Sequence, residues 1–182
     1  MTSEPLGEHA VFRAYLGTPR GARVLDLGRT APEAERWALK GGAADYHGVD
    51  AADLGRWSGA GLGTFDLVLS WMALHRVRNV ARLLETVHHH LVPGGRLVFA
   101  VPHPVVTADP DRPGGGGYFR EGQRTAGDVV FWHRTLESYL YELRCCGFRL
   151  VELSEGTPVH GAGPVAPELP FRVTFRCQRR TR

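Results

Sequence analysis

The chain has 182 residues, of which 43% are hydrophobic, and this size and composition predict one folded domain over residues 1–182. No apolar run approaches the roughly 20 residues that span a bilayer, and the first residues lack the pattern of a secretory signal, so we expect a cytoplasmic protein without a membrane partner. The net charge of +3 is mild, and we expect the basic residues 176–182 to be a solvated end rather than a nucleic-acid site.

The first elements in chain order are a helix, a strand and a second helix. An apolar stripe at helical spacing predicts an N-terminal helix within residues 1–22. The apolar run Arg23–Gly28 predicts a buried strand that ends at a tight turn. Thr30 and Glu33 have the spacing of a capping box, with Pro32 in the first turn, so the second helix is expected from residue 31 to residue 40. Its Trp37 and Leu39 side chains are expected to pack on the sheet.

The next segment is short and acidic. Residues 45–50 predict a strand that ends in a carboxylate, Asp50, about 20 residues beyond Gly28, where dinucleotide-binding folds place the acid that accepts from ribose hydroxyls. Between Asp50 and Phe65 there is no room for a helix, a strand and both connections. Either one βα unit is missing, or the strand at 45–50 stands in for two.

The second half of the chain shows clearer apolar periodicity. Residues 65–70 and 96–101 predict buried strands, and residues 80–91 an amphipathic helix between them. Residues 104–128 are rich in proline and glycine and predict a flexible lid loop. Thr135 is a candidate N-cap for a helix that ends at Gly147, and segments 148–153 and 171–177 predict a closing antiparallel hairpin.

Six segments of this pattern belong together in one known family. They are Val24–Gly28, Gly48–Asp50, Phe65–Ser70, Ala73–His75, Leu91–Val98, and His133–Thr135 with Gly147 and Phe148. Over roughly residues 22–156 they resemble class I S-adenosylmethionine-dependent methyltransferases, particularly bacterial enzymes that act on small molecules. The resemblance implies an α/β, Rossmann-like, doubly wound and mostly parallel sheet with a C-terminal antiparallel hairpin. The chain departs from the family in its glycine-rich turn, which reads G-R-T-A-P from Gly28, and in the missing βα unit.

The resemblance also implies S-adenosyl-L-methionine as cofactor, bound at the carboxyl ends of the strands. Asp26, Gly28 and the turn through Thr30 would hold its methionine end, and Asp50 the ribose hydroxyls. If the strand at 45–50 stands in for two, Asp53 would hold the adenine amino group. The sulfonium side would be lined by Ser70, Trp71 and Leu74, with the Trp71 ring available to stabilise the cation.

Three histidines are candidate catalytic bases. His75 follows a strand of the family pattern, and it is either a base for a substrate hydroxyl or amine or a histidine that hydrogen-bonds the backbone at a helix start. His103 and His133 lie where the substrate pocket is expected, and each is either a base or a brace for its loop. The run of histidines at 88–90 points in three directions on a helix, and the three cysteines form no C-x-x-C pair, so we expect no metal site.

Two functions from different classes remain open. The first is methyl transfer to an O or N atom of a small metabolite, which the intact Asp26 and Asp50 favour. The second is a cofactor-free relative that works as an isomerase, a cyclase or an accessory subunit, which the missing glycines favour. No motif identifies the substrate, and a homodimer that completes the pocket is a further expectation.

Overall fold

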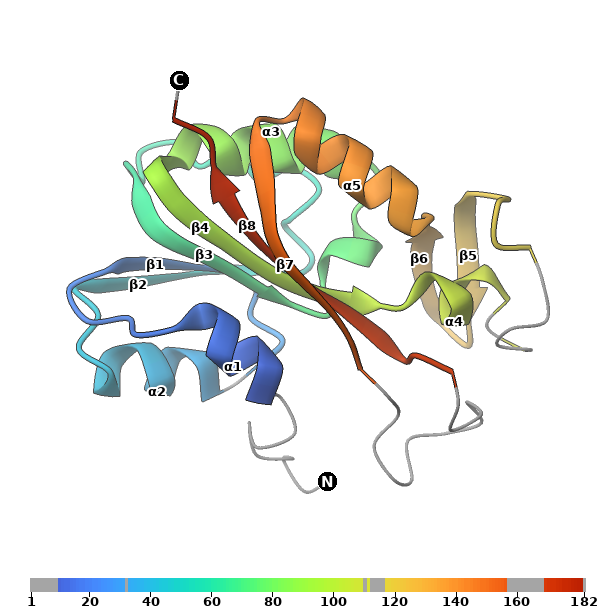
Figure 1. The fold of residues 1–182 in the computed structure, drawn as a ribbon, viewed down its shortest axis with the longest axis horizontal. Helices are drawn as coiled ribbons and strands as arrows, with labels where there is room; N and C mark the ends of the chain where they lie inside the picture. Colours follow the sequence, from blue (N-terminus) through green and yellow to red (C-terminus); the bar gives the residue numbers. More distant parts are fainter. Residues whose placement is uncertain (1–9, 32, 110, 112–116, 157–168, 182) are drawn as a thin grey trace.

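The protein is built on one six-stranded sheet, seen in a computed structural model that describes residues 10–31, 33–109, 111, 117–156 and 169–181 (Figure 1). The strand order is β2-β1-β3-β4-β8-β7. The first four strands pair in parallel, and β8 pairs antiparallel with β4 and with β7. This confirms the predicted sheet and its hairpin. The strand bounds are β1 Arg23–Gly28, β2 Asp45–Asp50, β3 Phe65–Trp71, β4 Leu91–Pro102, β7 Phe148–Gly156 and β8 Arg172–Arg179.

The sheet is one unit shorter than a full doubly wound sheet. In that fold the third strand lies outside the second, in the order 3-2-1-4-5-6. Here β2 is the edge strand, and residues 51–64 contain turns but neither a helix nor a strand. The prediction of a missing βα unit is therefore confirmed, and the carboxyl end of β2 is left at the margin of the sheet.

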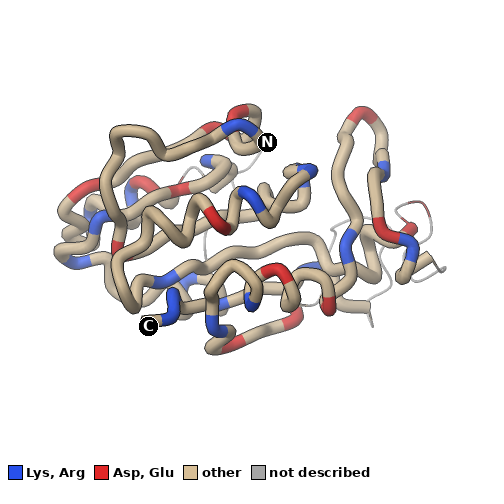
Figure 2. The backbone as a smooth tube through the Cα atoms, turned by 90° about the horizontal axis from the view of Figure 1, so that it is seen from above, with Lys and Arg blue, Asp and Glu red and all other residues tan. Residues whose placement is uncertain are grey.

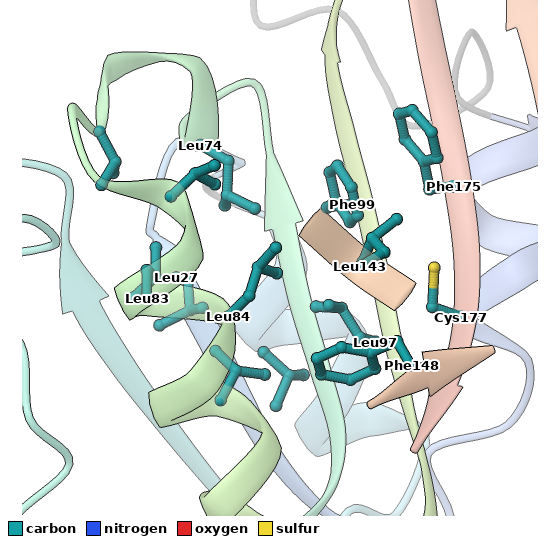
Figure 3. Close-up of a cluster of buried hydrophobic side chains, with 14 of the residues drawn as sticks. Leu27, Leu74, Leu83, Leu84, Leu97, Phe99, Leu143, Phe148, Phe175 and Cys177 are labelled. Carbon is teal, nitrogen blue, oxygen red and sulfur yellow. The ribbon is translucent and has the colours of Figure 1, made fainter. Parts of the chain in front are cut away.

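Helices cover both faces of the sheet (Figure 1). On one face lie α1 (Ala10–Leu16) and α2 (Glu33–Lys40), over a small cluster of buried side chains. On the other face lie α3 (Val80–His90) and α5 (Leu136–Cys145), over a larger cluster drawn in part in Figure 3. The apolar residues of α3 recur at helical spacing and are buried, so this face is stabilised by the hydrophobic effect along its length.

The start of α2 differs from the prediction. The helix begins at Glu33, and the Thr30 hydroxyl donates to the backbone carbonyl of Trp71 at the end of β3 instead of capping the helix. Thr30 therefore ties two strand ends together, and the predicted capping box is wrong. Leu39 is 55% exposed and does not pack on the sheet, whereas Trp37 does. Pro32 and the first nine residues of the predicted N-terminal helix lie outside the described residues.

Segment 104–128 is more regular than a loop. It contains a short helix, α4 (Pro104–Ala108), and a strand, β5 (Gly122–Ala126), which pairs with β6 (Val129–His133) in a separate hairpin. The sequence of β5 has no alternating apolar residues, so periodicity could not reveal it. A role as a lid stays a prediction, and residues 110 and 112–116 lie outside the described part.

The charged residues are spread over the described chain. Acidic and basic residues are interspersed along the backbone rather than gathered in one segment (Figure 2). Among the described residues, no helix is long and apolar enough to cross a membrane.

Candidate functional site

The candidate site lies where the parallel strands end. Gly28 and Asp50 are partners in the register of β1 and β2, and Trp71 ends β3 beside β4. Open α/β sheets bind their ligands at the carboxyl ends of the strands, where the chain switches from one face to the other. The switch occurs here between β1, which leads to α2 on one face, and β3, which leads to α3 on the other.

Asp26 is a buried acid close to the end of β1. Its side chain is 1% exposed, and its Oδ2 accepts a hydrogen bond of 2.7 Å from the hydroxyl of Tyr46 on β2. Its Oδ1 is buried and has no hydrogen-bond partner among the described residues. Burial raises the pKa of Asp26 to about 6, although the Tyr46 hydroxyl and the nearby backbone N–H of Arg29 act in the opposite direction. A buried acceptor without a partner is costly, so this oxygen is suited to a ligand that donates to it.

The turn after β1 is closely packed. Gly28 has a φ of +112°, and a Cβ at this position would lie 2.4 Å from the Cβ of Ala73, so only glycine fits. Arg29 follows with a φ of +48°. Its side chain crosses β2 at Gly48, where a Cβ would lie 2.5 Å from the Arg29 Cδ. The bulky arginine of the turn is therefore accommodated by a glycine on the next strand.

Arg29 is paired with two carboxylates. Its guanidinium lies 3.8 Å from Asp50 and 4.0 Å from Glu35; the side chains of Arg29 and Glu35 are about half exposed, and that of Asp50 is 68% exposed. With Ala31 and Tyr46 these residues line a cleft of about 430 Å³ beside the ends of β1 and β2. Exposed pairs of this length contribute about 0–1 kcal/mol, so a ligand could displace them at small cost.

The other predicted cofactor residues divide between the site and the scaffold. Asp53 pairs with Arg56, three residues further on, and does not line the cleft. Ser70 is fully buried, and its hydroxyl donates to the Leu27 carbonyl at 2.6 Å, which joins β3 to β1. Leu74 is 1% exposed and belongs to the larger buried cluster (Figure 3). Both side chains are engaged inside the protein, so a contact with the cofactor stays a prediction for them.

Trp71 already has a cationic neighbour. The Cζ atom of Arg172 on β8 lies 5.6 Å from the centroid of the indole, and Phe12 of α1 contacts its edge with a centroid distance of 4.9 Å. A guanidinium above an indole ring is a favourable cation–π pair. The predicted contact between Trp71 and a sulfonium is untested, and a second cation near this ring would be repelled by Arg172.

His75 lies in a short 3₁₀ helix, η2 (Leu74–Arg76), directly after β3. Its side chain is 7% exposed, its Nδ1 has no partner among the described residues, and its ring lies 6.1 Å from that of Phe131. Burial, together with the positive charges of Arg76 and Arg134, lowers the pKa of His75 to about 4. The imidazole is therefore neutral at pH 7, the form that accepts a proton.

His103 and His133 use both ring nitrogens in hydrogen bonds. His103 accepts from the backbone N–H of Val105 at 3.1 Å and donates to Glu155 at 2.7 Å. His133 donates to the Tyr118 carbonyl and accepts from the Thr107 hydroxyl, both at 2.8 Å. Burial lowers the pKa of each histidine. These contacts fit the interpretation of loop bracing, and a catalytic role for either histidine stays a prediction.

The histidine run at the end of α3 diverges, as helical geometry requires. His89 bonds the Glu85 carbonyl within the helix, whereas His90 bonds the carbonyls of Gly63 and Ser58 at 2.7 and 3.2 Å. His90 therefore anchors the turn segment 51–64 that occupies the place of the missing unit. Among the described residues, no three His, Cys, Asp or Glu side chains gather in a group that could hold a metal.

Tyr46 and Glu35 were missed by sequence reasoning. Tyr46 lies two and four residues before Gly48 and Asp50, so all three share one face of β2. That period of two was the available signal, because it places a hydroxyl on the same face as the acid at the strand end. Glu35 lies in the first turn of α2, and nothing in its sequence context indicates that it faces Arg29.

The chain is similar to known methyltransferases in sequence and in fold. A family model described as a methyltransferase domain matches residues 8–152. A solved S-adenosylmethionine-dependent methyltransferase from Mesorhizobium loti is 30% identical, with a TM-score of 0.77 over 94% of this chain and 97% of that one. A Listeria monocytogenes structure described in the same way is 23% identical, with a TM-score of 0.83 over 98% and 100%.

A more distant structure carries ligands. It is the 1,6-didemethyltoxoflavin-N1-methyltransferase of Burkholderia thailandensis with bound 1,6-didemethyltoxoflavin and S-adenosylhomocysteine. Its identity is 18% and its TM-score 0.62, over 96% of this chain and 77% of that one, so the likeness is one of fold. The comparison with curated proteins gave no match.

Proposed function

Because this chain belongs to the S-adenosylmethionine-dependent methyltransferase family, we propose that it transfers a methyl group from S-adenosyl-L-methionine to an O or N atom of a small molecule. The observation that carries the proposal is the polar cleft at the ends of β1 and β2. It is lined by Asp50 and by Tyr46, and the Tyr46 hydroxyl bonds Asp26, whose other oxygen is buried without a partner among the described residues. The predicted family roles of Asp26, Gly28 and Asp50 therefore fall in one place.

The charges of the cleft fit this cofactor. Two carboxylates, on Glu35 and Asp50, line the cleft with one guanidinium, on Arg29, whose charge also acts on the buried acid Asp26. S-adenosyl-L-methionine carries an ammonium group and a sulfonium, and both are cations that an acidic site favours. Asp26 would hold the ammonium group and Asp50 the ribose hydroxyls. Gly28, which has no side chain, would let the backbone of the turn pass close to the strand ends.

The cofactor, when bound, supplies an electrophilic methyl group on a positive sulfur. The protein then has to hold the acceptor in line, and such alignment can remove on the order of 7–11 kcal/mol of a barrier. His75 is the histidine with an unpartnered nitrogen, and as a neutral imidazole it would accept the proton that a hydroxyl or amine acceptor loses. The apolar surroundings that lower its pKa also keep water away from it.

The cofactor-free alternative depends on the missing glycines, and the geometry of Arg29 weakens it. The arginine side chain lies over Gly48 and is neutralised by Glu35 and Asp50. Its charge is thus balanced, which meets the objection that a free guanidinium would repel a sulfonium. The position of Arg29 explains how the chain can carry an arginine in this turn and still keep Asp26 and Asp50.

The test is calorimetry of the full chain with S-adenosylhomocysteine. We expect micromolar binding that Asp50→Ala weakens on the order of tenfold or more, because a charge-assisted hydrogen bond is lost. Asp53→Ala is the matched control, since Asp53 is an acid of the neighbouring turn that pairs with Arg56. No heat at millimolar ligand, with a folded wild-type protein, would overturn the proposal.

A further inference from the structure

We propose that Tyr46 is a positioning residue for the cofactor: by donating to one oxygen of Asp26, it keeps that carboxylate oriented and leaves the other oxygen for the ligand's ammonium group. The inference deepens the proposed function and rests on it. Tyr46 itself acts through Asp26 and has no part in the methyl transfer.

The two residues meet across neighbouring strands. Asp26 is opposite Gly48 in the register of β1 and β2, and Tyr46 is opposite Val24, so the tyrosine ring reaches along the face of the sheet to the carboxylate. Its hydroxyl lies 2.7 Å from Oδ2. Gly48 has no side chain that would separate them. Because one oxygen is bound in this way, the rotation of the carboxylate is restricted and Oδ1 keeps its direction.

Few charged groups face Asp26, and they come from three elements. Tyr46 belongs to β2, Arg29 to the turn, and Glu35 to α2. On the other side of β1, the partner of Asp26 in β3 is Leu69, which does not titrate. Arg29 favours the ionised acid and Glu35 opposes it, so the Tyr46 hydrogen bond is the main contact that offsets the cost of burial.

This arrangement predicts a dependence on pH that a merely structural tyrosine would not produce. The ionised Asp26 binds an ammonium group much more strongly than the protonated acid does, and its pKa of about 6 lies near physiological pH. Affinity for an ammonium-bearing ligand should therefore fall as pH drops through this value. A hydroxyl that donates to a carboxylate lowers its pKa, so removing the hydroxyl raises the pKa and moves the fall in affinity to higher pH.

The experiment compares wild type, Tyr46→Phe and Tyr141→Phe by calorimetry with S-adenosylhomocysteine at about pH 6 and about pH 8. A pKa raised by about one unit makes Tyr46→Phe bind about fivefold more weakly at the lower pH and about as tightly as wild type at the higher pH. Tyr141 is exposed on α5, so Tyr141→Phe is the control that should match wild type at both. Titration of the Asp26 carboxyl by carbon NMR should show the raised pKa directly in Tyr46→Phe.

Two outcomes overturn the inference while the proposed function stands. Either Tyr46→Phe loses the same factor at both pH values, which would mark a structural role, or it binds like wild type at both. If the folded wild-type protein does not bind S-adenosylhomocysteine at any pH, the proposed function fails and this inference fails with it.

Discussion

The sheet has two regions of different construction. Strands β3, β4 and β8 lie in its centre and bury nearly continuous apolar runs, with the rings of Phe99 and Phe175 stacked 4.6 Å apart. Strands β1 and β2 lie at an edge that is one unit short, and β2 buries fully only Val49. The central strands supply stability, whereas the shortened edge holds the buried acid, the ion pairs and the cleft. The predicted cofactor contacts of Asp26 and Asp50 therefore lie where the scaffold is least complete.

The largest expected effect is a loss of stability, and it is tested by replacing one leucine in each region. Leu97→Ala in β4 should lower the free energy of unfolding near the upper end of about 2–5 kcal/mol, because strands on both sides hold the cavity open. Leu54→Ala should lie near the lower end, although Leu54 is also buried, because it belongs to a turn segment that can collapse around the missing side chain. Urea unfolding measures both. Equal losses would contradict the proposed division of stability.

The central region was the easier one to predict from sequence. The β3 and β4 runs and the stripe of α3 are strongly apolar, so burial alone fixes their type and nearly their bounds. β5 could not be found, because Gly122–Ala126 has no buried side to alternate with an exposed one. The start of α2 was misplaced because the Thr30 hydroxyl bonds the Trp71 carbonyl, and a contact between residues so far apart in sequence leaves no local pattern.

The second prediction uses His75, which belongs to the central region. Its folded-state pKa of about 4 is below the ordinary 6.5, so the unfolded chain binds the proton more tightly and stability falls as pH drops through this interval. The full difference corresponds to about 3 kcal/mol. His75→Phe keeps an aromatic ring but cannot titrate, so it should lose less stability than wild type between about pH 7 and about pH 4. Urea unfolding at both values checks this, and parallel curves would exclude His75 as a source of acid sensitivity.

The third prediction has the opposite sign and belongs to the shortened edge. The folded-state pKa of Asp26, about 6, is above the ordinary 3.8, so the native state binds the proton more tightly and stability falls as pH rises through this interval. Asp26→Asn removes a buried charge and should raise the free energy of unfolding by up to about 3 kcal/mol above pH 7, with little effect near pH 4. The same variant should lose S-adenosylhomocysteine binding. If Asp26→Asn raised the free energy of unfolding equally at both pH values, the gain would not come from removing an ionised Asp26.

The site was predictable only as far as strand ends reveal it. Gly28 and Asp50 were found because each closes a recognisable strand, and Asp26 because it belongs to the Asp-Leu-Gly run at the end of β1. Ser70 and Leu74 also lie near a strand end. The Ser70 hydroxyl, however, donates to the Leu27 carbonyl, and the Leu74 side chain packs in the core. Tyr46 was missed because it lies within its strand, and only the distance to Asp26 shows its connection with the acid.

The smallest expected effect concerns Arg29. Its left-handed backbone costs about 1–2 kcal/mol, which glycine would not incur, but glycine loses more chain entropy on folding and gives up two half-exposed ion pairs. These terms nearly cancel, so Arg29→Gly should change the free energy of unfolding by less than about 1 kcal/mol. Because Arg29 competes for the Asp50 carboxylate, the same change should strengthen S-adenosylhomocysteine binding about threefold, most clearly at low salt.

Arg56→Gly is the matched control, since Arg56 forms the equivalent pair with Asp53 outside the cleft. Its affinity should equal that of wild type in calorimetry at low and high salt. Weaker binding by Arg29→Gly would show instead that the guanidinium contacts the ligand. The Arg29 side chain would then replace the backbone contacts that a glycine-rich turn makes with its ligand. The shortened edge of the sheet would bind the cofactor through a side chain instead of through the backbone.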